Sequence, residues 1–157
     1  MWTTSVARAS EDHEARFLAF GCELADLLIS LGVDARLGAV PGEYCPGAHS
    51  VNARGTVKLV GTAQRVVRAA WLFSSLIIVD GADRLRPLLM AVYQALSLPF
   101  DPVSVGSVRE EADAVDALTV ERAVLDRFGH GSRPEATPHE TGSLALAMEL
   151  LDQHRVS

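Results

Sequence analysis

Hydrophobic residues recur along this chain with two different periods. Between residues 17 and 31 they return every three or four positions, which predicts an amphipathic helix. Ser10 is placed to cap that helix, and Gly32 is placed to end it. Residues 33–39 alternate between apolar and polar side chains, which is the pattern of a half-buried strand. The first 40 residues therefore predict a helix followed by a strand.

The middle of the chain predicts further strands. Two Pro-Gly signals mark residues 41–47 as a loop. We expect a short strand near 49–52, a hairpin turn at 52–55 and a strand over 56–67. Gly61 suggests a bulge or a point of close approach in that strand. The apolar run 71–79 predicts a buried strand, with Trp71 and Phe73 in the core.

The second half predicts helices. One covers 83–98, with Pro87 in its first turn, and a third helix covers 115–128. Residues 103–113 between them have the composition of a polar connector. The apolar stripe predicted for the helix over 83–98 consists of Leu85, Leu88, Leu89, Val92 and Leu96.

These elements predict an α+β fold, with a small, mostly antiparallel sheet of about four strands and flanking helices. We divide the chain into a leader over 1–9, a domain over 10–129, and a linker with a C-terminal helix over 130–157. A sheet of four strands is thin, so both of its outer strands need cover or a partner.

Composition narrows the class of protein. The chain has 157 residues, of which 48% are hydrophobic and 22% charged, and these globular values exclude a disordered chain. A net charge of −6 argues against a nucleic-acid partner. The longest apolar run, 69–79, is too short to cross a bilayer, and the N-terminus lacks the apolar core of a signal peptide. We therefore expect a soluble cytoplasmic protein with no membrane partner. The five histidines lack ligand spacing, so we expect no metal.

The one lysine of the chain lies in its most informative segment. Thirteen of the 14 basic residues are arginine, and the exception is Lys58. GC-rich coding explains why lysine is rare, but it does not explain where Lys58 lies. The predicted hairpin brings Lys58 toward Cys45, and an ammonium group near a thiol favours the nucleophilic thiolate. The same ammonium could stabilise an oxyanion or a carboxylate, while Gln64 could donate hydrogen bonds to a ligand. By spacing alone, Lys58 can equally be a solvated lysine and Cys45 a small hydrophobic residue beside a turn.

Three neighbouring segments carry a family resemblance. They are 43–47 (EYCPG), 49–51 (HSV) and 55–65 (GTVKLVGTAQR). Together they resemble the lipoate–protein ligase and octanoyl/lipoyl transferase family, which shares a catalytic domain with biotin–protein ligases. The resemblance covers roughly residues 12 to 129. It implies the fold of the C-terminal half of that catalytic domain.

The resemblance also implies roles for individual residues. Lys58 matches the catalytic lysine that contacts the acyl carbonyl or carboxylate, and the adenylate in ligases. Cys45 matches the thiol that carries the acyl group in one transferase branch. Four residues match the strand that lines the acyl pocket: Gly61, Thr62, Ala63 and Gln64. The implied transferred group is lipoate or octanoate, with ATP as a further substrate in the ligase branch. The implied acceptor is a lysine of a lipoyl domain or of the glycine-cleavage carrier protein.

The chain also departs from the family pattern. It contains no Gly-Gly pair, whereas family members carry an Arg-Arg-x-x-Gly-Gly-Gly segment that grips the acyl carboxylate or phosphate. Ser50 stands where the family has Asp or Asn, and Arg68 is followed by Ala69 where the family has Gly. We expect roughly the first 80 to 100 residues of the family domain to have no counterpart here.

Three hypotheses remain open on the sequence alone. In the first, the chain is an enzyme: a transferase with a Cys45 thioester, or an ATP-dependent ligase in which Cys45 is incidental. In the second, it is a non-catalytic module that complements a separately encoded N-terminal half. In the third, it is a truncated, inactive remnant. Lys58→Met tests the first, and from the sequence we expect that variant to lose activity without losing much stability.

Overall fold

The computed structural model describes residues 13–67 and 70–129, and beyond them residues 145, 148 and 150. The chain divides into two compact units, 1–127 and 128–157, which are treated separately. In the second unit, residues 145, 148 and 150 are helical. The leader, the Ser10 cap, the linker and the rest of the predicted C-terminal helix lie outside the described residues, so the division into domains stays a prediction.

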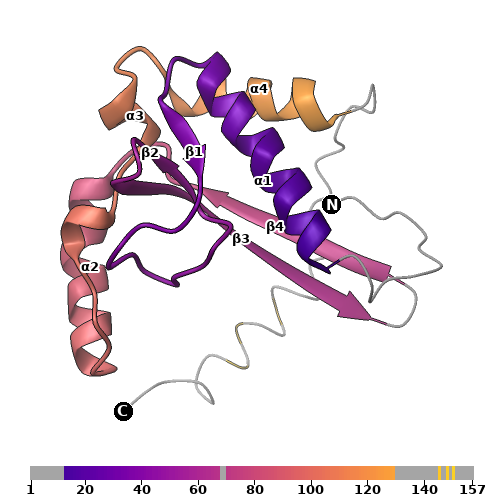
Figure 1. The fold of residues 1–157 in the computed structure, drawn as a ribbon. Helices are drawn as coiled ribbons and strands as arrows, with labels where there is room; N and C mark the ends of the chain where they lie inside the picture. The colour runs from indigo at the N-terminus through magenta and orange to yellow at the C-terminus, as the bar shows by residue number, and fades with distance from the viewer. Residues whose placement is uncertain (1–12, 68–69, 130–144, 146–147, 149, 151–157) are drawn as a thin grey trace. The chain divides into compact units, whose positions relative to one another are not determined.

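A four-stranded antiparallel sheet forms the centre of the first unit (Figure 1). Its strand order follows the sequence: β1 (Ala35–Leu37), β2 (Val51–Ala53), β3 (Val57–Val67) and β4 (Ala70–Ile77). The turn between β2 and β3 places Arg54 and Gly55 at φ values of 57° and 74°. Two successive left-handed residues match the twist of a tight hairpin, as the sequence predicted. The α+β class and the four strands are confirmed.

Helix α1 (His13–Ser30) covers one face of the sheet. Its Phe20 stacks on Phe73 of β4 with the ring centroids 4.6 Å apart, and it meets Trp71 edge-on. These contacts fix α1 across β4, and the helix ends before Gly32, whose φ of 91° supplies the left-handed C-terminal residue.

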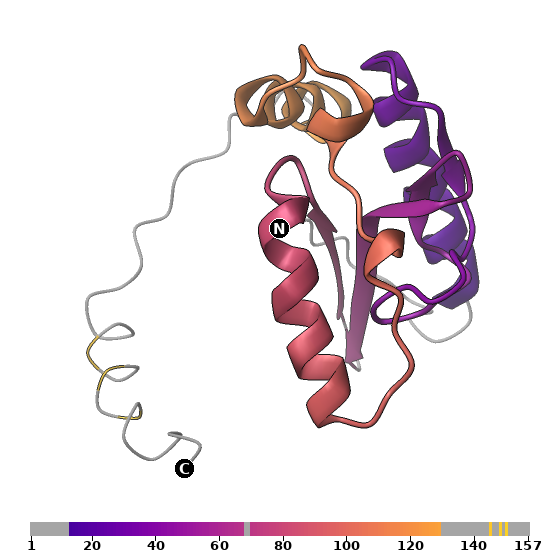
Figure 2. The same ribbon diagram turned by 90° about the vertical axis from the view of Figure 1, so that its left-hand side faces the viewer.

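Helix α2 (Ala82–Ala95) lies on the opposite side of the sheet from α1 (Figure 2). It turns Ala82, Leu85, Leu89 and Tyr93 toward a small core that contains Ile78 and Val105. The predicted stripe was partly wrong, because Leu88, Val92 and Leu96 are exposed. Pro87 was also misplaced: it lies in the second turn of the helix, where its ring removes one main-chain hydrogen bond.

The segment predicted to be a polar connector over 103–113 is buried in part, at residues 104–108. It forms a short 3₁₀ turn, η1 (Pro102–Ser104), followed by α3 (Val108–Glu111). Val105 and Val108 are fully buried, and Val105 forms a parallel bridge with Lys58 of β3. The Ser and Gly residues gave this segment the composition of a connector, but here their small side chains allow it to pack closely against the sheet. Helix α4 (Ala117–Phe128) follows, and its Arg127 forms an ion pair with Glu23 of α1.

One face of the β3–β4 hairpin is open. Cross-strand pairing places Gly61 opposite Leu76, and Ala63 opposite Ser74, on the face away from α1. Leu76 is 64% exposed and Leu72 is 38% exposed, so the prediction of a fully buried strand was wrong for this face. The irregularity predicted at Gly61 falls earlier in β3, because Asn52 pairs with Lys58 while Val51 pairs with Val60. The extra residue is Leu59. We call the exposed positions of this face the open face: Ala63, Arg65, Val67, Leu72, Ser74 and Leu76.

Candidate functional site

A hollow of about 670 Å³ lies where the loop between β1 and β2 meets the β3–β4 hairpin. Its walls combine three kinds of surface: the backbone and side chains of the loop, the small residues of β3, and the polar edge of β4. The lining residues are Phe17, Tyr44, Cys45, Pro46, Gly47, His49, Ser50, Lys58, Gly61, Thr62, Ala63, Ser74, Ser75 and Leu76. The structure therefore brings most of the predicted site residues into one hollow.

Lys58 lines this hollow, and its side chain is only 2% exposed. Its Nζ donates hydrogen bonds to the carbonyl oxygens of Tyr44 and Cys45, each at 2.9 Å. The Tyr44 ring centroid lies 4.6 Å from Nζ, within the range of a cation–π contact. The interpretation of Lys58 as a solvated lysine is therefore wrong, since the loop encloses the ammonium group.

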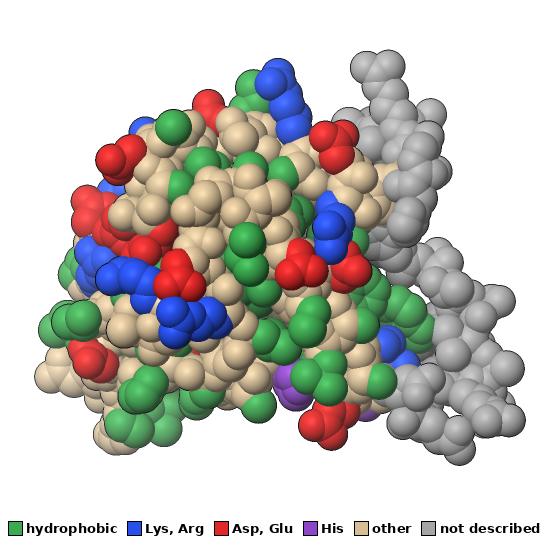
Figure 3. All heavy atoms as spheres, turned by 45° about the horizontal axis from the view of Figure 1, so that its top comes forward, with side chains coloured by type: hydrophobic (Ala, Val, Ile, Leu, Met, Phe, Trp, Pro, Cys, Tyr) green, Lys and Arg blue, Asp and Glu red, His purple; other side chains and the backbone are tan. Residues whose placement is uncertain are grey.

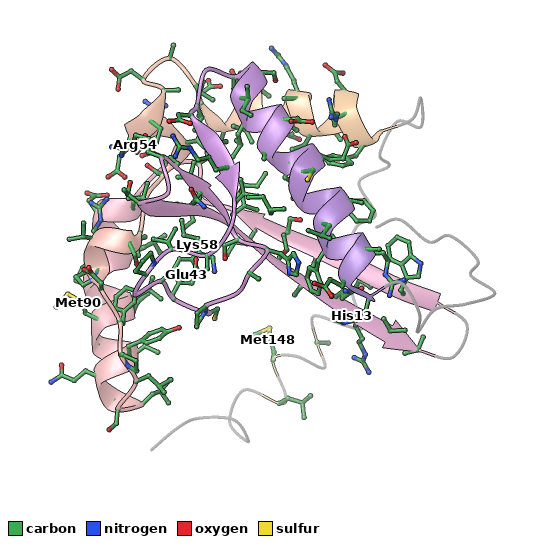
Figure 4. The ribbon with its side chains drawn as sticks, viewed as in Figure 1. His13, Glu43, Arg54, Lys58, Met90 and Met148 are labelled. Atoms are coloured by element: carbon green, nitrogen blue, oxygen red, sulfur yellow. The ribbon has the colours of Figure 1, made fainter. Side chains whose placement is uncertain are left out.

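Glu43 is the anionic partner of Lys58. Its Oε2 lies 3.5 Å from Nζ, and the side chain of Glu43 is fully buried. Its Oε1 accepts hydrogen bonds from the Gly47 amide at 2.9 Å and the Ser50 hydroxyl at 3.1 Å. Figure 4 shows Glu43 and Lys58 next to each other. One carboxylate therefore fastens the loop and faces the ammonium.

The burial of this pair changes the stability expected of Lys58→Met. Removing one partner of a buried ion pair leaves the other charge unpaired, which costs about 3–5 kcal/mol. We therefore expect Lys58→Met to destabilise the chain, in place of the nearly neutral effect that the sequence alone suggested.

Cys45 is held by its backbone on both sides. Its amide donates a 2.6 Å hydrogen bond to the Tyr93 hydroxyl of α2, and its carbonyl accepts from Lys58. Its φ of 41° lies in the left-handed region, which costs a non-glycine residue free energy and persists only where the surroundings enforce it. The exposed thiol lies 4.0 Å from the Tyr93 hydroxyl oxygen. Lys58 and Cys45 do meet across the loop, but the ammonium binds the carbonyl of Cys45.

Tyr44 has a neutral phenol. Burial, followed by the negative charge of Glu43, raises the pKa of Tyr44 to about 12. Its hydroxyl is buried and has no hydrogen-bond partner among the described residues. Tyr44 therefore contributes its carbonyl oxygen and its ring face to the ammonium.

The four predicted pocket residues of β3 separate into two groups. Gly61, Thr62 and Ala63 line the hollow. A Cβ atom on Gly61 would lie 3.6 Å from Lys58 Cε, so glycine keeps the space beside the lysine stem open. Gln64 shares the α1-facing side of β3 with Thr62 but does not line the hollow; it accepts a hydrogen bond from Arg16 Nε and donates one to the His13 carbonyl. Gln64 therefore anchors α1 in this structure.

Sequence reasoning missed two residues of this site. The sequence analysis gave Glu43 no role of its own. The signal that could have found it is an acidic residue near Cys45 together with the single lysine, Lys58, on a neighbouring strand. Tyr93 is 48 residues from Cys45, and no local pattern indicates that contact. His49 lines the hollow and stacks on Phe17 with the ring centroids 5.2 Å apart, and Cys22 is exposed on α1.

Surface charge is mixed. Arg54 pairs with Glu111, Arg86 with Glu110 and Arg109 with Asp80. In the face drawn in Figure 3, basic and acidic side chains are interspersed. Among the described helices, none combines the length and apolarity needed to cross a membrane.

Comparison with solved structures identifies the fold of this chain. No family model and no curated protein matches the chain. Among solved structures, lipoate-protein ligase A bound with ATP matches with a TM-score of 0.62 at 21% sequence identity, over 96% of this chain and 59% of that one. The chain has the fold of lipoate–protein ligases. The protein of a bipartite lipoate protein ligase system from Thermoplasma acidophilum matches at a TM-score of 0.61 and 21% identity, over 96% and 58% of the two chains. A T. acidophilum structure with bound lipoic acid matches at 0.62 and 21%, over the same shares.

These matches also set the extent of the likeness. The chain spans 58–59% of the length of the solved ligase chains. The shared fold agrees with the resemblance to the C-terminal part of the catalytic domain that the sequence suggested.

Proposed function

We propose that this chain takes part in attaching a lipoyl-type acyl group to a lysine of a carrier protein. The observation that carries the proposal is the enclosure of Lys58 and the backbone of Cys45 by one loop, beside a hollow in a lipoate–protein ligase fold. A buried ammonium that lines a partly apolar hollow suits the carbonyl or carboxylate of an acyl chain that lies along Gly61 and Ala63.

The exposed thiol supports a transferase in particular. In the proposed step, Cys45 Sγ forms a bond to the carbonyl carbon of an octanoyl or lipoyl thioester. The bond from that carbon to the donor's sulfur breaks, and the donor leaves as a thiol that takes up the proton released by Cys45. The neutral Nζ amine of the acceptor lysine, on a lipoyl domain or the glycine-cleavage carrier protein, then attacks the enzyme thioester; the amide forms, the bond from the carbonyl carbon to Cys45 Sγ breaks, and Cys45 leaves as a thiol that takes up the proton lost by the amine. Lys58 would stabilise the oxyanion that forms on the carbonyl in each step.

ATP-dependent ligation is the second form of the same activity. Here Lys58 would contact an acyl-adenylate, and Cys45 would take no part. Among the structural neighbours, one lipoate-protein ligase A is bound with ATP and one T. acidophilum protein holds lipoic acid. Transfer that requires ATP and survives Cys45→Ser would favour this form.

The test is acylation of the chain by an octanoyl-carrier-protein donor, followed by mass spectrometry. We expect one octanoyl group on Cys45, lost in Cys45→Ser. Cys22 is also exposed and serves as the internal control, because it should stay unmodified. No adduct on the wild-type chain, or an equal adduct on Cys22, would contradict the transferase.

A second candidate function is that of a complementing module, and the open face favours it. Leu72 and Leu76 are exposed on β4, which is an outer strand of the described sheet. An exposed apolar edge strand is a surface on which another chain can add strands. The T. acidophilum system named above is described as a bipartite ligase with an E2 lipoyl domain. We propose that a polypeptide carrying the remainder of the ligase fold would cover this face.

Co-purification with a candidate partner tests this second function. Leu76→Arg should abolish the association, because it replaces the most exposed leucine of the open face with a second cation beside Arg65. Leu18→Arg is the matched control, since Leu18 is also exposed but lies on α1. A wild-type chain that transfers acyl groups fully as a monomer would contradict the complementing module.

A further inference from the structure

Glu43 takes no part in the acyl-transfer steps proposed above, but its surroundings indicate a separate role. Three features of its surroundings define it: the side chain is fully buried, Oε1 is occupied by two hydrogen bonds of the loop, and Oε2 faces Lys58 at 3.5 Å. Among the described residues, Oε2 accepts no hydrogen bond. A buried carboxylate with one free oxygen beside an ammonium compensates charge without occupying a donor.

The number of N–H donors on Lys58 explains why it matters that Glu43 Oε2 accepts no hydrogen bond. An ammonium group has three N–H donors, and Lys58 gives two of them to the carbonyls of Tyr44 and Cys45. If Glu43 took the third, the group would be saturated. Because Glu43 acts through charge at 3.5 Å, one N–H stays available for an oxygen in the hollow.

We infer that Glu43 is a positioning residue that holds the Lys58 ammonium and the Cys45 loop as one unit, leaving one N–H of Lys58 directed to the acyl oxygen. The link is a single side chain: Oε1 holds the loop at Gly47 and Ser50, and Oε2 holds the charge of Lys58. The loop in turn supplies the carbonyls that orient Nζ. This inference rests on the proposed function only for the identity of the oxygen that Lys58 meets.

The Glu43→Gln variant separates the loop hydrogen bonds of Oε1 from the charge interaction of Oε2 with Lys58. Glutamine keeps a carbonyl oxygen where Oε1 accepts from Gly47 and Ser50, and it places an uncharged NH₂ donor against Lys58. Ser50→Ala is the matched control, because it removes one loop hydrogen bond and leaves the carboxylate facing Nζ. The inference predicts a large effect on Lys58 from the first variant and a small one from the second.

A first readout needs no activity. Since Lys58 is the one lysine of the chain, ¹⁵N-lysine labelling gives a single side-chain ammonium signal in NMR spectra of the full chain. We expect its protons to exchange with water at least about tenfold faster in Glu43→Gln than in the wild type, and within about twofold of the wild type in Ser50→Ala. Equal exchange in the wild type and Glu43→Gln would overturn the inference.

A second readout uses acyl transfer to Cys45. We expect Glu43→Gln to lower kcat by about tenfold or more and to leave KM for the octanoyl donor within about twofold, because a misdirected ammonium weakens the contact to the developing oxyanion. A larger change in KM than in kcat would overturn the positioning role. If the wild type transfers no acyl group while Glu43→Gln still speeds ammonium exchange, the proposed function fails and the positioning of Lys58 stands.

A double variant keeps the test valid if a single variant folds poorly. Lys58→Met leaves the buried Glu43 carboxylate without its cationic partner, whereas the double variant Glu43→Gln/Lys58→Met removes both charges. We expect the double variant to melt at a higher temperature than Lys58→Met. An equal or lower melting temperature would show that the two side chains are not coupled, and would overturn the inference.

Discussion

Tyr44 serves the site through its carbonyl oxygen and its ring, while its hydroxyl contributes nothing favourable. The ring face lies 4.6 Å from Lys58 Nζ, and the hydroxyl is buried without a hydrogen-bond partner among the described residues. A buried polar group that lacks a partner costs about 1–3 kcal/mol. Because phenylalanine keeps a ring that can face the cation, the hydroxyl can be tested separately from the ring.

The Tyr44→Phe variant should change how stability depends on pH. In the native chain the pKa of Tyr44 is about 12, above the value near 10 of an unfolded tyrosine. The raised pKa contributes stability that is fully present below pH 10 and is lost as the pH rises through about 12, because only the unfolded state releases its proton over that range. We expect the wild type to lose on the order of 1–2 kcal/mol more than Tyr44→Phe between pH 10 and 12, measured by urea unfolding. Parallel losses in both proteins would contradict this.

At the scale of single residues, the sequence selected residues that share one hollow, but it did not indicate the contacts that hold them. Lys58 and Cys45 were identifiable because one is the sole lysine and the other lies in a Pro-Gly loop beside it. Glu43 and Tyr93 were not, since the burial of Glu43 and the hydrogen bond from Cys45 to Tyr93 depend on how the loop folds against β3 and α2. Gln64 shows the converse: its place in the motif suggested the pocket, but its side chain is hydrogen-bonded to Arg16 and to the His13 carbonyl of α1.

Among the elements, the segment 102–108 contacts the backbone of Lys58. The Gly106 amide donates to the Lys58 carbonyl at 3.2 Å, and the Val108 amide donates to the Ile78 carbonyl at 2.9 Å. This segment therefore braces the start of β3 from the side opposite β2. Its approach is close because residue 106 has no side chain.

Gly106→Ala should loosen that brace. A Cβ atom on Gly106 would lie 2.7 Å from Val57 Cγ2 and 2.9 Å from Val57 Cβ, so the segment or β3 must shift. We expect a loss of about 1–3 kcal/mol in the free energy of unfolding, measured by denaturant titration. Gly47→Ala is the control: a Cβ atom there meets nothing within 4 Å, so its stability should stay within about 0.5 kcal/mol of the wild type. Equal effects of the two substitutions would contradict the close approach.

Element types were more predictable than their surroundings. The period of the apolar residues gave α1, and the Asn-Ala-Arg-Gly turn gave the β2–β3 hairpin, because both signals are local. The burial of Val105 and the exposure of Leu76 could not be deduced in this way. Both depend on what lies against the segment: β3 lies against Val105, and no described element covers Leu76.

At the scale of the whole molecule, the hollow and the open face are continuous. Leu76 and Ser74 line the hollow and also belong to the open face. A polypeptide that covered the open face would therefore also close a wall of the hollow.

The first unit should be stable without the second. The buried hydrophobic residues of the described chain fall between Leu24 and Val120, and the sheet lies wholly within residues 35–77. We therefore expect a chain ending at residue 129 to melt within about 2 °C of the full chain, a difference below about 0.5 kcal/mol for a domain of this size. Calorimetry measures the midpoint, and the ratio of Cys45 to Cys22 alkylation by iodoacetamide reports whether the loop is intact, since both thiols are exposed. A midpoint lowered by more than about 5 °C, or a changed alkylation ratio, would show that residues 130–157 contribute to the domain and that the predicted boundary is wrong.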